Sequence, residues 1–259
     1  PGRGRRLPGA AALGLGVAGP VPGRPRARRP QPAAAGVALQ RSLYSVEALA
    51  ATRRVCERLR VSVQAVLLAV GAVALGRFEG RDRLTLALMS ANRLDPRWAE
   101  LVGSLNQYSP VTLDLDGGRH PDEYLAAVYP QCLTAYLNGG YDVDALAAAL
   151  AKAGTPDPDP TAFAKHFNFL GPVDAEPEAG SELRTGVHWR DSRQRTGPNL
   201  HLATAFGDGL LIGVGASEAY LPGDAPARVA AAIEAGLLSL DRGDAATLSE
   251  LDLTPLRPA

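Results

Sequence analysis

Cysteine is scarce in this sequence, in which Cys56 and Cys132 are the only two among 259 residues. Both fall in predicted helices, which excludes a disulfide framework and an all-cysteine zinc site. Aromatic residues make up only 5% of the chain, and no run of about 18 apolar residues is free of Gly, Pro and charge. We therefore expect no transmembrane helix and no membrane partner, and the free cysteines favour a cytoplasmic location.

An excess of basic charge is also lacking, because Lys and Arg together number 27 and so do Asp and Glu. Residues 1–36 contain seven Arg and no acidic residue, so the rest of the chain is net acidic. Affinity for nucleic acid comes mainly from clustered basic side chains that neutralise phosphates. We therefore expect no nucleic-acid partner. The strong preference for Arg over Lys is typical of a GC-rich bacterial genome.

Motifs for nucleotide binding, metalloprotease chemistry and a serine nucleophile are absent, including G-x-G-x-x-G, the P-loop, H-E-x-x-H and G-x-S-x-G. No two histidines have the i, i+4 spacing of helical metal ligands, so the sequence predicts no metal site. The four are His120, His166, His188 and His201. Among them His166 is the one candidate catalyst, because it begins a predicted strand beside Asn168.

Composition divides the chain into three parts. Residues 1–36 hold eight Gly and seven Pro without helical or strand periodicity, which predicts a disordered segment. Residues 37–240 carry the periodic pattern of a folded domain. Residues 241–259 are expected to form a C-terminal tail.

Hydrophobic spacing predicts helices and strands in the order ααββααββββα. The helices are expected to begin near Ser45, Ser62, Pro121, Asp142 and Asp224, which are N-cap residues or a proline suited to the first turn. The strands are expected at 84–89, 111–115, 166–170, 183–189, 200–206 and 210–217. This order predicts an α/β two-layer sandwich with a mixed, largely antiparallel sheet.

One stretch resembles a known family. Ser90-Ala91-Asn92-Arg93 is followed by a turn that begins at Val102-Gly103, and then by an alternating strand that starts after Asn106-Gln107. This arrangement resembles the second, C-terminal lobe of nonribosomal peptide synthetase condensation domains, which belong to the superfamily of chloramphenicol acetyltransferase and CoA-dependent acyltransferases. The resemblance covers residues 37–240 and includes Phe167-Asn168-Phe169-Leu170-Gly171. It implies a chloramphenicol acetyltransferase-like lobe.

The sequence also departs from this family. The family's active-site motif, His-His-x-x-x-Asp-Gly, lies in the first lobe, and this sequence has no adjacent pair of histidines. Its His-Gln-Asp-x-Pro-Phe-Glu segment corresponds to residues 137–144, where only an aspartate and the apolar spacing match. The resemblance therefore assigns no catalytic residue to this chain and implies that a lobe carrying the His motif acts with it in cis or in trans.

The candidate site residues are Asn92, Arg93, Asn106 and Gln107. Asn and Arg beside strand ends commonly bind backbone carbonyls, so one interpretation is that these residues only hold the loop. Asn106 and Gln107 could instead hydrogen-bond the amides of a pantetheine arm. No bound cofactor is expected, since the resemblance implies that the acyl group arrives on the phosphopantetheine of an acyl or peptidyl carrier protein.

Three functions are compatible with these features. The first is a condensation-type acyltransferase lobe that forms an amide or ester from a carrier-bound thioester in bacterial secondary metabolism, and that is incomplete without the lobe carrying the His motif. The second is a non-catalytic scaffold or carrier-docking protein with a degenerate condensation fold. The third is an acyl-CoA-dependent acyltransferase of the wax-ester-synthase type.

Overall fold

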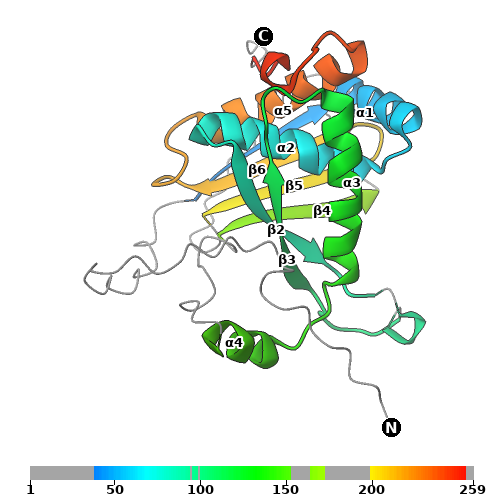
Figure 1. Cartoon of the computed structure of the whole chain (residues 1–259), viewed down its shortest axis with the longest axis vertical. Coiled ribbons are helices and arrows are strands. Elements are labelled where there is room, and N and C mark those ends of the chain that lie inside the picture. Colours follow the sequence, from blue (N-terminus) through cyan, green and yellow to red (C-terminus); the bar gives the residue numbers. More distant parts are fainter. Residues whose placement is uncertain (1–37, 94, 99, 153–163, 173–198, 255–259) are drawn as a thin grey trace, which may run out of the picture.

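The computed structural model describes residues 38–93, 95–98, 100–152, 164–172 and 199–254 (Figure 1). The segment 1–36, which we expected to be disordered, and the expected strand 183–189 lie outside these residues. Within them, no single helix is long and apolar enough to cross a membrane. Two consecutive helices, bent by 110° at their junction, meet that test of length and composition only as a pair.

The described strands form one sheet in the order β1-β6-β5-β4-β2-β3. They are β1 (Ala38–Ser45), β2 (Arg83–Ser90), β3 (Gln107–Asp114), β4 (Lys165–Pro172), β5 (Leu200–Phe206) and β6 (Leu210–Ser217). Strand β4 runs parallel to β2 and to β5, whereas the other neighbouring pairs are antiparallel. The sheet is therefore mixed and largely antiparallel, which confirms the predicted fold class.

The helices lie mainly on one face of this sheet (Figure 1). They are α1 (Val46–Leu59), α2 (Val63–Glu79), α3 (Pro121–Leu137), α4 (Val143–Lys152) and α5 (Ala225–Arg242). Helices α1, α2, α3 and α5 contact the strands and one another, while α4 lies apart from the sheet. No described helix covers the opposite face. We call it the open face; it carries Tyr108 of β3, His166 of β4 and His201 of β5.

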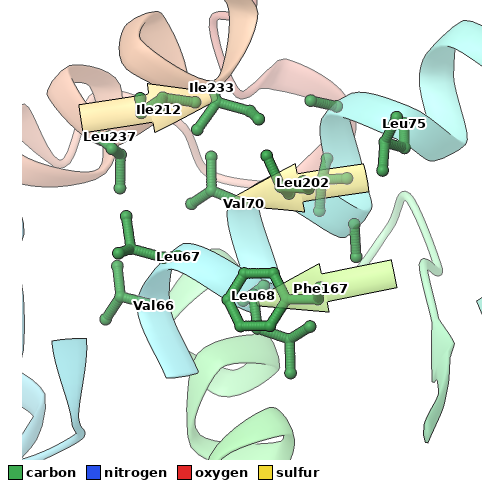
Figure 2. Packing of buried hydrophobic residues seen from close by; sticks show 14 of the residues in the cluster. Val66, Leu67, Leu68, Val70, Leu75, Phe167, Leu202, Ile212, Ile233 and Leu237 are labelled. Carbon is green, nitrogen blue, oxygen red and sulfur yellow. The ribbon is translucent and has the colours of Figure 1, made fainter. Parts of the chain in front are cut away.

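Helix α2 forms the centre of the core because it is apolar on all sides. It begins at the N-cap Ser62, whose side chain accepts a hydrogen bond from the Ala65 amide, and every residue from Ala65 to Gly76 is buried. Gly71 allows this helix to lie close to β5, since a Cβ atom there would come within 2.6 Å of Leu202. Figure 2 shows Leu67, Leu68 and Val70 among side chains from the sheet and α5. The two layers therefore share one continuous core.

A half-buried ion pair links the start of β4 to the end of α2. The Lys165 ammonium lies 2.5 Å from a carboxylate oxygen of Glu79 at the end of α2, and both side chains are 14% exposed. The Tyr220 hydroxyl donates to the same carboxylate, and the Lys165 ammonium lies 5.6 Å from the centre of the Tyr220 ring. Removing one partner would leave the other charge without its partner in a partly buried position, which destabilises the fold. This cluster therefore holds the strand immediately before His166.

Strand β1 was not predicted from the sequence. It pairs along its length with β6 and places Leu43 in the core with no exposed surface. Its polar residues Gln40 and Arg41 weaken the alternation of polar and apolar residues by which a strand is recognised. It forms a strand because β6, far along the chain, supplies its hydrogen-bond partners.

The C-terminal segment also differs from the expected tail after residue 240. Helix α5 continues to Arg242, and residues up to 254 pack against the helices, with Leu248 and Leu251 buried. The Arg77 guanidinium donates to the backbone carbonyls of both leucines, at 2.8 Å in the case of Leu251. Residues 241–254 are therefore part of the folded domain.

Glu234 is an acidic side chain inside this core. It is 6% exposed, and its Oε2 atom has no hydrogen-bond partner among the described residues. Burial raises the pKa of its carboxyl group, Glu47 adds to the rise, and a hydrogen bond with Ser45 opposes it. The pKa of this carboxyl is therefore higher in the folded state than in the unfolded state. The fold loses stability as the pH rises from the unfolded-state pKa to the folded-state pKa.

We expect Glu234→Gln to stabilise the protein at pH 7 and to make little difference at a pH below the unfolded value of the carboxyl. The reason is that the Glu234 carboxyl destabilises the fold only when it is ionised, because its charge is then buried, and the amide of Gln never carries that charge. Thermal unfolding followed by circular dichroism between pH 4 and pH 8 measures this difference. Glu218→Gln, at an exposed position, is the matched control, and an equal gain in both variants would contradict the explanation by burial.

Candidate functional site

Asn92 lies at the centre of a hydrogen-bond cluster at the end of β2. Its side-chain Nδ2 donates to the carbonyls of Leu105 at 2.9 Å and Gly139 at 3.0 Å, and to Oε1 of Gln107 at 3.1 Å. Its Oδ1 accepts from the Ser90 hydroxyl at 2.9 Å. The backbone of Asn92 is left-handed, with φ of 51°, a conformation that Asn tolerates better than most residues. Asn92 thus joins β2 to the start of β3 and to the segment after α3.

Gln107 extends the same cluster to the segment between α3 and α4. Its Oε1 accepts from the Tyr141 amide at 3.1 Å, and its Nε2 donates to the Tyr141 carbonyl at 2.8 Å. The Tyr141 hydroxyl in turn donates to the carbonyl of Tyr108 at 2.9 Å. Burial raises the pKa of the Tyr141 phenol, so it is a protonated donor at neutral pH. The side-chain amide of Gln107 is therefore engaged through both of its polar atoms.

Gly139 is required by the closeness of this packing. A Cβ atom at Gly139 would lie 2.5 Å from Cβ of Ser90 and 2.8 Å from Oδ1 of Asn92. These distances are shorter than real contacts between such atoms, so a larger residue would displace the Asn92 cluster. The segment after α3 and the end of β2 consequently hold each other in place.

Arg93 closes the loop between β2 and β3. Its two terminal nitrogens donate to the carbonyl of Trp98 at 2.7 Å and to the carbonyl of Gly103 at 2.6 Å. A guanidinium that donates to two carbonyls across a loop restrains the loop's shape. Arg93 therefore acts on the backbone of its own loop in this structure.

Asn106 lies apart from the Asn92 cluster. Residues of a strand alternate between its two faces, so within β3 Gln107 points toward the helices while Tyr108 points toward the open face. The Asn106 amide nitrogen lies 3.8 Å from the sulfur of Met89, which is its one polar contact among the described residues. Asn106 is exposed, and so it alone of the four loop candidates has an uncommitted amide.

His166 lies on the open face within a row of rings. Its ring stacks on that of Tyr108, with centroids 3.9 Å apart and planes inclined by 27°. On its other side lies His201, with ring centroids 6.3 Å apart and planes at 75°. Burial lowers the pKa of His201 and raises that of Tyr108. Both of these rings are therefore uncharged at neutral pH.

The structure thus divides the five sequence candidates between two places. Asn92 and Gln107 meet in one cluster beside Arg93, where their contacts favour a loop-holding role, while contact with a pantetheine arm stays a prediction. Asn106 and His166 lie on the opposite face. Sequence reasoning missed Gly139, Tyr141, Tyr108 and His201. Of these, only Gly139 could have been recognised from its neighbours in the sequence, because it is part of the Gly139-Gly140 pair. The other residues are brought to the site by contacts between distant segments.

Comparisons with known proteins bear on the fold. No family model matches the sequence, and no curated protein matches it. Solved structures do match: the condensation domain of the Monacolin K polyketide synthase gives a TM-score of 0.66 at 16% identity, covering 87% of this chain and 51% of that one. The first condensation domain of the CDA synthetase gives 0.61 at 18% identity, covering 83% and 48%.

A related kind of domain matches equally well. The epimerization domain from the third module of tyrocidine synthetase B gives a TM-score of 0.61 at 17% identity, covering 90% of this chain and 54% of that one. This chain therefore spans about half the length of the solved domains that it resembles. Its mixed sheet, with helices packed on one face, has the fold of the C-terminal lobe of a condensation-type domain.

Proposed function

We propose that this chain is the second lobe of a condensation-type acyltransferase of bacterial secondary metabolism, acting in the cytoplasm. It would join an acyl group from a carrier-bound thioester to an amine or a hydroxyl. The observation that carries this proposal is the fold match to condensation domains over most of this chain but only about half of theirs. The open face, which no described helix covers, supports a partner lobe at that surface.

The reaction defines what the partner lobe must supply. The nucleophile attacks the thioester carbonyl carbon, the carbon–sulfur bond breaks, and the proton of the nucleophile passes to the thiolate of phosphopantetheine. A positioned base contributes typically ~10²–10⁴ in rate. This sequence has no adjacent pair of histidines, so the base is expected from the other lobe. This lobe would contribute a wall of the site through the open face and the loop at Asn106.

Two measurements on the purified chain test the proposal. With an acyl-carrier thioester and an amine, we expect product only at the rate of uncatalysed aminolysis, and no change in His166→Ala. In an NMR titration we expect weak binding of the phosphopantetheine-loaded carrier and weaker binding of the unmodified carrier, which is the matched control. Turnover abolished by His166→Ala would contradict the missing base, and equal binding of both carriers would contradict a role for the pantetheine arm.

A non-catalytic scaffold is the second candidate, and the Asn92 cluster favours it. The amides of Asn92 and Gln107 are engaged within the chain, so they stabilise the loop without a substrate. Addition of a lobe that carries His-His-x-x-x-Asp-Gly separates the two functions. Product formation after that addition supports the acyltransferase, whereas carrier binding without product supports the scaffold. Acyl-CoA in place of the carrier tests the wax-ester-synthase alternative in the same assay.

A further inference from the structure

The pairing of the strands arranges the side chains of the open face in rows. Tyr44 of β1 is paired with Leu211 of β6, and both lie in one row. Two residues further along β6, Gly213 lies in the next row, and Gly215 lies in the row after that, paired with His201 of β5. Because residues two apart in a strand share a face, these rows lie on the side of the sheet that no described helix covers (Figure 1).

The open face has few carboxylate, ammonium or guanidinium groups. In β1, β4, β5 and β6, the residues that strand alternation places on this face include no Asp, Glu, Lys or Arg. In β2 and β3 the exceptions are Arg83 and Asp114, which are paired with each other at one corner of the sheet. Juxtaposed like charges are what most strongly opposes association of two surfaces. Two copies of this face can therefore meet without that repulsion.

Gly213 and Gly215 leave part of β6 without side chains on this face. Neither residue has the positive φ that favours glycine. A Cβ atom would meet no described atom closer than 3.5 Å at Gly213 or 3.8 Å at Gly215, so the packing within the chain does not require glycine there either. Glycine inside a strand weakens it and often marks a place where another backbone approaches closely. The two glycines thus favour close approach by a surface from outside the described residues.

We propose that two copies of this chain associate through their open faces, related by a two-fold axis that passes over Gly213 and runs across the strands. Gly213 lies midway between Leu211 and Gly215, so this axis places Leu211 of each copy opposite Gly215 of the other. Leu211 is 38% exposed in the single chain, and its side chain would occupy the space above the glycine. Sheets packed face to face lie about 10 Å apart, which suits side chains of this size.

The size of the face fits a weak homodimer. Six strands of seven or eight residues cover an area of about 25 Å by 25 Å, or ~600 Å² per copy, at ~4.8 Å between strands and ~3.3 Å per residue. Two copies would bury ~1,200 Å² together, which is the lower end of the range for specific interfaces. Leu170 of β4 is 54% exposed at the same end of the face as Leu211 and adds apolar surface.

This inference rests on the fold and on the open face, and the acyltransferase reaction has no part in it. A second copy would occupy the surface that the proposed function gives to a partner lobe. The homodimer is therefore the state of the chain in the absence of that lobe, and its failure would leave the assays of the proposed function unaffected.

Sedimentation equilibrium of the full chain at pH 7.5, from about 1 to 200 µM, tests the proposal over the range expected of a weak interface. We expect the average mass to rise with concentration from the 27.0 kDa of one chain toward twice that value. Leu211→Arg should weaken dimerisation at least about tenfold, because the interface would bury two unpaired guanidinium groups. Leu133→Arg is the matched control, since Leu133 is 45% exposed on α3, away from the open face, and this variant should dimerise as the parent does.

Gly215→Val is a second variant that should keep the fold. Valine favours strands, so unfolding of the monomer followed by circular dichroism should occur at no lower temperature than in the parent. Its side chain would occupy the space proposed for Leu211 of the other copy, so dimerisation should weaken. A chain that stays monomeric at every concentration, equal weakening by Leu211→Arg and Leu133→Arg, or parent-like dimerisation of Gly215→Val would each overturn the proposal.

Discussion

Replacing Phe167 by Ala should lower the free energy of unfolding by about 3–5 kcal/mol, the range for removal of a large aromatic side chain from a core. Phe167 has no exposed surface and lies on β4, a central strand. Figure 2 shows its ring beside Leu68 of α2. The cavity left by the ring would be lined by both layers at once. Urea unfolding followed by circular dichroism measures the loss.

Leu170→Ala is the matched control, because Leu170 lies on the same strand and is 54% exposed. Surface substitutions usually change stability by about 0.5 kcal/mol or less, so the two variants should differ several-fold. Phe167→Leu should fall between them, since it restores part of the lost volume. Equal losses in the two alanine variants would show that Phe167 is not the residue of β4 that faces the core.

The second large effect is expected for Asn92→Asp. This substitution keeps the shape of the side chain but replaces its donor by an oxygen that faces the carbonyls of Leu105 and Gly139. Loss of a hydrogen-bond partner costs a buried acceptor about 1–3 kcal/mol, and these part-buried bonds should lie at the lower end of that range. We expect a loss in that range, together with faster hydrogen exchange at the Tyr141 amide, because Gln107 would lose its restraint from Asn92.

Asn106→Asp controls for the added charge. It makes the same chemical change in the same loop, but Asn106 is exposed and its amide contacts only the Met89 sulfur among the described residues. Its stability and its exchange rates should remain close to those of the parent. If Asn92→Asp exchanged no faster than Asn106→Asp at Tyr141, the Asn92 cluster would not be what holds the segment after α3.

Helix α2 and the β5–β6 hairpin were predictable because their signals are local. The Ser62 cap, the apolar run that follows it and Gly80 in the left-handed conformation lie within a few turns of one helix. The Gly207-Asp208-Gly209 turn likewise joins strands that are adjacent in the sequence, and the Gly207 amide donates to the Gly209 carbonyl at 3.0 Å. In both cases the residues that form the element also contain the information for it.

Strand β1 and the segment after α5 were not predictable for the opposite reason. β1 is extended because β6 pairs with it. Leu248 and Leu251 are buried because their side chains pack in the core, and Arg77 of α2 binds their carbonyls. Neither segment has a strong periodicity of its own. Their structures depend on hydrogen-bond partners and apolar surface supplied from far along the chain.

The same distinction applies to the site. The sequence by itself determined the helices and most strands, the mixed fold class, and the loop in which Asn92, Arg93, Asn106 and Gln107 lie. Only the tertiary structure decided that Asn92 and Gln107 share one cluster on the helix side and that His166 and His201 lie together on the open face. Strand alternation and β4–β5 pairing fix those positions, and both depend on register between distant segments, which no local pattern of residues encodes.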